Sequence, residues 1–344
     1  YIDKGDTQCN DDGLTLEETS SYLTDADIAI TESACGVIIG VENTTVCGAN
    51  TSNIHIHTID FLDLTKAENI GFKDVFSLSS VDLSYEVVTD CVNVSTSMPE
   101  PLYQAHSHND YEHDRPLLDA LAQGFNSVEA DVYLVDDQLL VAHDRNDVTT
   151  SRTLETLYLD PLFARFNQYD GHIYPRSTKP LVLLVDFKDQ GSILYPKLAS
   201  VLKKHQAMLT SVEGDELKNG AVTVIISGNT PYDLIVNDAN RLSFIDGRVG
   251  KSYNSDYSPA KMPLISTNWN NYFSWNGQTD FTAAEAQRLT EIVDEVHQQG
   301  KMLRFWAIPN TVAAWEIMHE AGVDLINTDD LEGLASYLRE QNAD

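Results

Sequence analysis

Two carboxylates that stand two residues apart on one expected strand are the clearest chemical feature of the sequence. The strand predicted over 127–134 contains Glu129 and Asp131, and alternate residues of a strand share a face. Carboxylates enclosed side by side repel each other unless a cation neutralises them. A hard divalent ion is the natural partner for such oxygen ligands. The alternative is an exposed strand whose charges alternate.

Other expected strands end in side chains suited to acid–base chemistry. His106 follows one apolar strand, His143 follows another, and a third ends in Asp186 with Lys188 two residues further on. Three carboxylates can hold one Mg²⁺ and leave its other positions to water or a substrate phosphate. Two histidines can serve as general base and general acid, and a lysine attracts an anion. The set predicts metal-assisted cleavage of a phosphate ester.

Strands that alternate with helices must position these groups. The pattern begins after a Ser- and Pro-containing linker near residue 98 and predicts strands over 102–105, 127–134, 139–142, 181–186, 222–227, 264–267, 302–306 and 325–327. Repeated βα units over 99–344 predict a TIM-type (β/α)8 barrel, in which catalytic groups stand at the C-terminal ends of the strands. A doubly wound sheet is the fallback, although no Gly-rich phosphate loop follows the first strand.

Residues 1–98 form a different kind of segment. Short alternating stretches predict a small β-rich domain, and all four cysteines and all three Asn-x-Ser/Thr sequons lie here: Cys9, Cys35, Cys47, Cys91, Asn43, Asn50 and Asn93. These features favour disulfides, glycosylation and an oxidising secretory compartment. The polar start favours a mature, secreted or extracellular form from which a signal has been removed. Sequence does not choose among the three possible cysteine pairings.

Two smaller features allow more than one interpretation. His55 and His57 share one face of an expected strand, either as a metal pair or, as the commoner case, as part of an exposed polar face. The aromatic residues near 269–275 either form an apolar docking loop or pack against the barrel.

The charge and hydropathy of the chain restrict its partners. The net charge is −31 over 344 residues, and such an acidic surface disfavours nucleic acid and anionic lipid as partners. Apolar runs are far shorter than the roughly 20 residues of a membrane span, so stable membrane insertion is not expected. The oligomeric state stays open.

Several of these segments resemble a known family. The Ala105-His106 pair, the segment 124–132 and the Val-Ala-His143-Asp144 segment are similar to glycerophosphodiester phosphodiesterases, which are TIM barrels of the phosphatidylinositol-phospholipase-C-like superfamily. The Asp186-Phe-Lys188 segment resembles spider-venom phospholipases D. The segment 106–113 is similar to a branch that includes fungal altered-inheritance-of-mitochondria phosphodiesterases. The likeness covers about residues 101–340.

The resemblance implies a role for each matching residue. Glu129, Asp131 and Asp186 would bind one divalent ion, with Mg²⁺ ahead of Ca²⁺. His106 and His143 would be the catalytic pair. The substrate-binding residues would be Lys188, Trp306, His108 and Asn109.

The chain also departs from the family pattern. Its His106-Ser-His108 stands where the family has His-Arg-Gly, so the usual phosphate-binding arginine is missing. Arg304 and Arg145 are the candidate substitutes. His108 competes with His106 for the catalytic role, and His106 is preferred because it directly follows the strand.

The expected function is metal-dependent cleavage of glycerophosphodiesters or related phospholipid-derived phosphodiesters by a pair of histidines. If the attacker is a hydroxyl group of the substrate itself, the enzyme is a phospholipase-D-like lyase that forms a cyclic phosphate. The alternative outside enzymes is a secreted binding or cell-surface protein that retains an inactive barrel.

Overall fold

The chain forms two units, Tyr1–Ser97 and Met98–Asp344. The computed structural model describes residues 1–5, 13–41, 51–75, 77–78, 83–88, 99–175, 177–214 and 216–342. Cysteines and helix–strand alternation had placed the boundary after residue 98, next to the division between these units.

An antiparallel sheet organises the first unit. Its strands lie in the order β1-β3-β2-β4, with bounds β1 Ile2–Asp3, β2 Ile30–Ile39, β3 Asn53–Ile59 and β4 Ser84–Val88. Two helices, α1 (Leu16–Asp25) and α2 (Leu64–Asn69), accompany it. A small apolar cluster is formed by Leu23, Ile28, Ala67 and Phe72. The expected β-rich unit therefore also contains helices.

Cysteine pairing and glycosylation stay predictions. Cys35 is buried in β2. The other cysteines and the sequons lie outside the described residues: Cys9, Cys47, Cys91, Asn43, Asn50 and Asn93.

His55 and His57 do not form the exposed polar face expected of them. Their ring nitrogens Nδ1 and Nε2, respectively, each lie 3.0 Å from the hydroxyl of Thr19 on α1. His55 is buried, and Nδ1 of His57 is 2.8 Å from the hydroxyl of Ser33. Packing of α1 on this face of the sheet reverses the expectation, because a strand pattern alone cannot show what covers the face.

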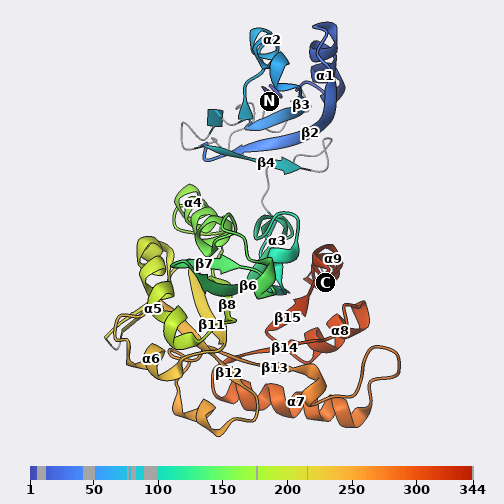
Figure 1. Cartoon of the computed structure of the whole chain (residues 1–344). Coiled ribbons are helices and arrows are strands. Elements are labelled where there is room, and N and C mark those ends of the chain that lie inside the picture. Colours follow the sequence, from blue (N-terminus) through green and yellow to red (C-terminus); the bar gives the residue numbers. More distant parts are fainter. Residues whose placement is uncertain are drawn as a thin grey trace. The chain divides into compact units, whose positions relative to one another are not determined.

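Eight parallel strands close into a barrel in the second unit (Figure 1). Going around the barrel, the order is β5-β15-β14-β13-β12-β11-β8-β6, and β5 also pairs with β6. The strands are β5 Leu102–Ser107, β6 Phe125–Val135, β8 Leu181–Phe187, β11 Val222–Gly228, β12 Ser243–Arg248, β13 Leu264–Asn268, β14 Met302–Trp306 and β15 Leu325–Thr328. The predicted TIM-type architecture is confirmed.

Two strands differ from the prediction. The stretch expected over 139–142 is β7 (Gln138–Val141), which pairs antiparallel with β6 as a hairpin and is not a barrel strand. The barrel strand that sequence reasoning missed is β12. It contains an Asp-Gly-Arg sequence that lacks the apolar pattern of a buried strand.

Helices lie on the outer side of the barrel strands (Figure 1). Their bounds are α3 Leu118–Ala122, α4 Asp160–Gln168, α5 Gly191–Leu202, α6 Tyr232–Asn237, α7 Ala283–Gln298, α8 Val312–Glu320 and α9 Leu331–Asn342. A short antiparallel pair, β9 (Ser211–Glu213) and β10 (Glu216–Lys218), lies between β8 and β11 in the chain. Within the described ranges, no helix has the length and apolar character needed to cross a bilayer.

Strand alternation divides the barrel interior into an apolar and a polar part. On β8, Val182 and Leu184 belong to an interior apolar cluster, and Asp186 follows them on the same face. The intervening Leu183 and Val185 pack in the large core formed with the helices. The apolar interior thus lies toward the strand starts, and charged side chains gather toward the strand ends.

Candidate active site

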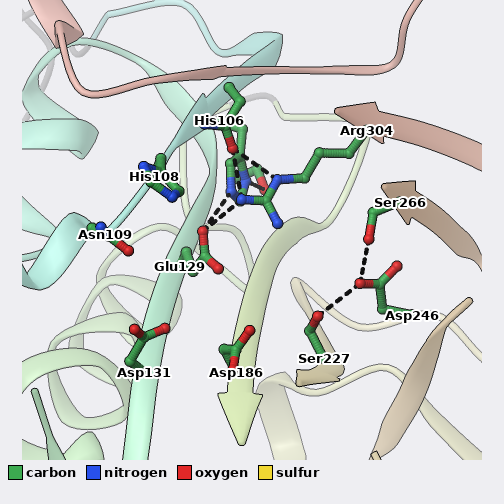
Figure 2. A network of polar contacts seen from close by, with 12 residues as sticks. His106, His108, Asn109, Glu129, Asp131, Asp186, Ser227, Asp246, Ser266 and Arg304 are labelled. Carbon is green, nitrogen blue, oxygen red and sulfur yellow. Dashed lines mark hydrogen bonds and ion pairs between the residues drawn. The ribbon is translucent and has the colours of Figure 1, made fainter. Parts of the chain in front are cut away.

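Three carboxylates meet where the middle of β6 pairs with the C-terminal end of β8. Ligand oxygens of Glu129, Asp131 and Asp186 all lie within 4.8 Å of one another, and Figure 2 shows their side chains near His106 and Arg304. Val128, Ala130 and Val132 belong to the core formed with the helices. The alternation predicted for this strand is confirmed, and the exposed-strand alternative is excluded.

Glu129 is held by a buried arginine. Arg304 on β14 donates from Nη2 to Oε2 of Glu129 at 2.6 Å, and its Nε and Nη2 donate to Oδ1 of Asn327 at 2.9 and 2.6 Å. Burial is the largest single effect and raises the pKa of Glu129, but the charge of Arg304 and the contact with His106 together outweigh burial and hold that pKa below its usual range. Glu129 is therefore an anion at the centre of the barrel.

His106 lies beside Glu129 and is fully buried. Its Nδ1 is 2.7 Å from the hydroxyl of Ser127, and its Nε2 is 3.5 Å from Oε2 of Glu129. Burial, aided by the positive charge of Arg304, lowers the pKa of His106 to about 3. The imidazole is consequently neutral near physiological pH and can accept a proton.

Asp131 has a different set of partners. Its Oδ2 accepts from the hydroxyl of Tyr111 at 2.6 Å and from Nζ of Lys188 at 2.9 Å, and it lies 3.4 Å from Nδ1 of His143. Burial, with the negative charge of Glu129, raises the pKa of Asp131 to about 6. The other oxygen, Oδ1, is buried without a hydrogen-bond partner.

The β6–β7 hairpin brings His143 to this carboxylate. Val141 of β7 pairs with Val132 of β6, and the next amide, that of Ala142, donates to the carbonyl of Asp131. His143 therefore returns to the level of Asp131, where half of its side chain is exposed. The two histidines thus lie beside different carboxylates of the β6 pair.

Asp186 and Lys188 complete the cluster from β8. Nζ of Lys188 lies 3.4 Å from Oδ1 of Asp186 in addition to its contact with Asp131. Gly228, at the end of the neighbouring β11, has a φ of +65°, and a Cβ there would be 2.3 Å from Oδ1 of Asp186. Glycine is therefore required at this position beside the carboxylate.

The remaining predicted residues lie around this cluster. Nδ1 of His108 is 2.7 Å from Oδ1 of Asp329, whereas His106 is the histidine in contact with Glu129. Asn109, in the left-handed region with a φ of +46°, has its Oδ1 3.0 Å from the hydroxyl of Tyr111. Trp306 lies beneath the guanidinium of Arg248.

The two candidate substitute arginines are in different surroundings. Arg304 is buried against Glu129, and Arg145 forms an exposed pair with Asp189. The aromatic residues Trp269, Phe273 and Trp275 are buried. Of the two interpretations of the aromatic segment, packing against the barrel is confirmed.

Sequence reasoning gave no role to several residues of the site. Tyr111 joins Asp131, Asn109 and His143 through one hydroxyl, and Asn327 orients Arg304. A further network centres on the buried Asp246, which accepts from the hydroxyls of Ser227 at 2.8 Å and Ser266 at 2.5 Å (Figure 2). Tyr111 lies in the segment 106–113 that carries a family resemblance, and this resemblance was the available signal.

The carboxylate cluster fits a hard divalent cation. Among the described residues, its three carboxylates form ion pairs with two lysine or arginine side chains, Lys188 and Arg304. Oδ1 of Asp131 is buried and unpaired, which is costly unless a ligand satisfies it. Glu129, Asp131 and Asp186 could therefore hold a metal ion through oxygen ligands of the kind that Mg²⁺ and Ca²⁺ take.

Comparison with known proteins shows which family part of the barrel resembles. A family model described as the AIM6-like phosphodiesterase domain matches residues 98–246. Residues 98–246, which are part of the barrel unit, are therefore similar to the AIM6-like phosphodiesterase domain. The match includes β5, β6, β7 and β8, and the matched residues contain both histidines and all three carboxylates.

Curated relatives bear the name Altered inheritance of mitochondria protein 6. The protein from Eremothecium gossypii is 28% identical over 270 residues, which cover 69% of this chain and 69% of that protein. The Arthroderma benhamiae homolog is 27% identical over 261 residues, with coverages of 67% and 82%. The Lachancea thermotolerans protein is 31% identical over 274 residues, with coverages of 67% and 64%.

Solved structures with some similarity include two glycerophosphodiester phosphodiesterases. The enzyme from Parabacteroides distasonis has 15% sequence identity and a TM-score of 0.41, and the match covers 71% of this chain and 100% of that one. The enzyme from Agrobacterium tumefaciens has 12% identity and a TM-score of 0.41, with coverages of 68% and 100%.

Proposed function

We propose that the barrel is a metal-dependent phosphodiesterase that cleaves glycerophosphodiesters or related phospholipid-derived diesters. The observation that carries this proposal is the meeting of three carboxylate ligands with two histidines on separate sides of the β6 pair. A cation held by Glu129, Asp131 and Asp186 would neutralise charge on nonbridging phosphate oxygens. Mg²⁺ is the preferred ion.

The side chains of the site divide the proton transfers between them. His106, neutral because of burial and Arg304, accepts the proton of the attacking hydroxyl. His143, exposed at the mouth, gives a proton to the leaving oxygen. Lys188 adds positive charge beside the bound phosphate. Tyr111 orients His143 and Asp131 through its hydroxyl.

Turnover of two phosphodiesters tests the proposal. Bis(p-nitrophenyl) phosphate and glycerophosphocholine are incubated with the full chain in Mg²⁺, Ca²⁺ or EDTA, alongside His143→Ala. His172→Ala is the matched control, because His172 is exposed and lies outside the carboxylate cluster. We expect metal-dependent cleavage that His143→Ala reduces by at least about 100-fold and that His172→Ala retains. Absence of cleavage with every metal would favour the alternative of a barrel retained for binding.

Phosphorus NMR of the product distinguishes the two possible attackers. A cyclic phosphate signal shows attack by a hydroxyl of the substrate, and the enzyme is then a lyase. Incorporation of ¹⁸O from water without a cyclic species shows direct hydrolysis.

A further inference from the structure

A polar pocket opens beside the carboxylate cluster. It has a volume of about 390 Å³, and its lining includes Arg248, Lys251, Thr267, Asn271, Tyr272 and Trp306. Two of these residues are cationic, in a chain whose net charge is −31. Neither the pocket nor Arg248 and Lys251 has a part in the chemistry proposed above.

The guanidinium of Arg248 is held in a fixed orientation at this pocket by groups of the protein. Its Nη1 lies 2.5 Å from Oδ2 of Asp246 and 3.2 Å from the hydroxyl of Ser266, and its Nη2 donates to Ser227 at 3.0 Å. The guanidinium carbon lies 5.3 Å from the centre of the Trp306 ring. Asp246 compensates the charge of Arg248. Arg248 would therefore contribute the geometry of its guanidinium to ligand recognition more than a net positive charge.

Lys251 supplies the uncompensated charge. Its side chain is exposed, and the described part of the chain offers it no ion-pair partner. Thr267 and Asn271 add a hydroxyl and an amide to the lining. A fixed guanidinium, a free ammonium and neutral donors around one cavity are the groups that recognise a carboxylate or a phosphate.

Residues on two strands, β11 and β14, connect the pocket with the carboxylate cluster. Ser227, which holds Arg248, pairs directly with Asp186 across β11 and β8. Trp306 stands two residues after Arg304 on β14, so the two side chains share a face, and Arg304 binds Glu129. A molecule whose phosphodiester lies at the carboxylates can therefore extend along the β12–β14 side into the pocket.

We propose that this pocket binds a second anionic group of the substrate, a carboxylate or a phosphate monoester, separate from the phosphate that is cleaved. The proposal rests on the phosphodiesterase function proposed above. It makes the preferred head group an anionic one.

Two pairs of substrates isolate the second anion. Glycerophosphoserine differs from glycerophosphoethanolamine by one carboxylate, and glycerophosphoinositol 4-phosphate differs from glycerophosphoinositol by one phosphate monoester. For each pair, kcat/KM is measured with the full chain, with Lys251→Gln and with Lys203→Gln. Lys203 is exposed outside the barrel and is the control for loss of one positive charge.

We expect the unsubstituted chain to prefer the more anionic member of at least one pair. In Lys251→Gln the ratio of kcat/KM for the more anionic member to kcat/KM for the less anionic member should fall about fivefold. The change should come mainly through KM, because the lost contact is remote from the reacting atoms. Lys203→Gln should leave the ratio unchanged. The pair that responds identifies the group as carboxylate or phosphate. If the kcat/KM ratios are equal in all three proteins and turnover is intact, the proposal that the pocket binds an anion is overturned. The phosphodiesterase function is then retained.

Binding without turnover separates the two proposals. Calorimetric titration of glycerophosphoserine and of glycerophosphoinositol 4-phosphate in EDTA needs no catalysis. Binding that weakens in Lys251→Gln, with no cleavage of any diester, supports the anion pocket and overturns the phosphodiesterase function. If neither compound binds in EDTA and no diester is cleaved, both proposals are overturned.

Discussion

At the scale of single residues, the buried Glu129–Arg304 pair joins the stability of the barrel to its chemistry. Both side chains are almost completely buried, and their charged atoms are 2.6 Å apart. Removing one partner of such a pair leaves the other charge buried and uncompensated, which costs about 3–5 kcal/mol. The pair therefore acts on folding as well as on the proposed metal site.

Glu129→Gln should lower the stability of the barrel and abolish its metal-dependent activity. We expect a free energy of unfolding lower by about 3–5 kcal/mol in denaturant titration and loss of metal-dependent turnover. The double variant Glu129→Gln/Arg304→Gln should regain part of the stability, because the unpaired charge is gone, and should stay inactive.

The exposed Arg145–Asp189 pair is the control for this prediction. Asp189→Asn should cost at most about 1 kcal/mol, since solvent screens that pair. A Glu129→Gln variant with unchanged stability and most of its rate would contradict both the structural and the metal-binding roles of Glu129.

Some residues of the site could be assigned from the sequence and others could not, for a physical reason. Glu129 and Asp131 could be assigned to one face because the period of a strand is local. Arg304 contacts Glu129 across 175 positions of the chain, and no local pattern encodes such a contact. Tyr111 was hidden in the same way, because its hydroxyl acts on Asp131 twenty residues away.

At the scale of elements, the β6–β7 hairpin positions His143. Its two-residue turn, Asp136 and Asp137, has positive φ at both positions, 46° and 61°. This is the turn geometry that Asn-Gly favours, and residues with a side chain adopt it at a cost of about 1 kcal/mol each. The positive φ angles of Asp136 and Asp137 therefore strain the turn. Substitutions that relieve this strain should not move His143.

Asp136→Asn/Asp137→Gly should raise the melting temperature of the barrel by about 1–3 °C, which corresponds to about 0.5–1 kcal/mol. The gain is partial because Asp137 also forms an exposed ion pair with Lys197. Turnover should be retained. The control Asp256→Asn/Asp280→Asn also removes two negative charges, but neither residue has a positive φ. Its melting temperature should not rise. A lower melting temperature of the turn variant would contradict the assignment of strain.

The misassigned strands show where the elements could not be predicted. β7 is as apolar as a barrel strand, and only its antiparallel pairing with β6 reveals that it lies outside the barrel. β12 was missed because Asp246 and Arg248 interrupt its pattern. Those two residues pair with each other inside the barrel mouth, so the interruption is itself part of the polar site.

In the first unit, strand β3 carries a histidine that should make stability depend on pH. Burial, with the neighbouring His55, lowers the pKa of His57 from 6.5 to about 4. Between these values the unfolded chain binds the proton and the folded unit does not. The free energy of unfolding of this unit should therefore fall as pH drops from about 6.5 to about 4, by about 1–2 kcal/mol after allowance for solvent screening.

Hydrogen exchange of the β2 and β3 amides measures this loss within the unit. The difference between the unsubstituted chain and His57→Gln is the quantity of interest, since carboxylates also titrate in this range. We expect His57→Gln to remove that part of the pH dependence, whereas His172→Gln in the barrel should retain it. Parallel pH curves for the unsubstituted chain and His57→Gln would contradict the buried, neutral histidine.

At the scale of the whole molecule, the two units differ in the chemistry of their cysteines. Cys9, Cys35, Cys47 and Cys91 all precede residue 98, and the barrel sequence contains none. If these residues form disulfides, as their number and the three sequons predict, each bond contributes about 2–4 kcal/mol to the first unit alone. Division of the chain into two units then allows one to lose stability without the other.

Calorimetry of the full chain with and without a reductant tests this difference. The transition of the first unit should shift down by 10 °C or more, because about 4 kcal/mol is large for a unit of fewer than 100 residues. The barrel transition, identified by its shift in Glu129→Gln, should not move. Iodoacetamide labelling without reductant should modify none of the four cysteines. Labelling at all four, or equal shifts of both transitions, would show that the first unit depends on its packed sheet and helices without disulfide support.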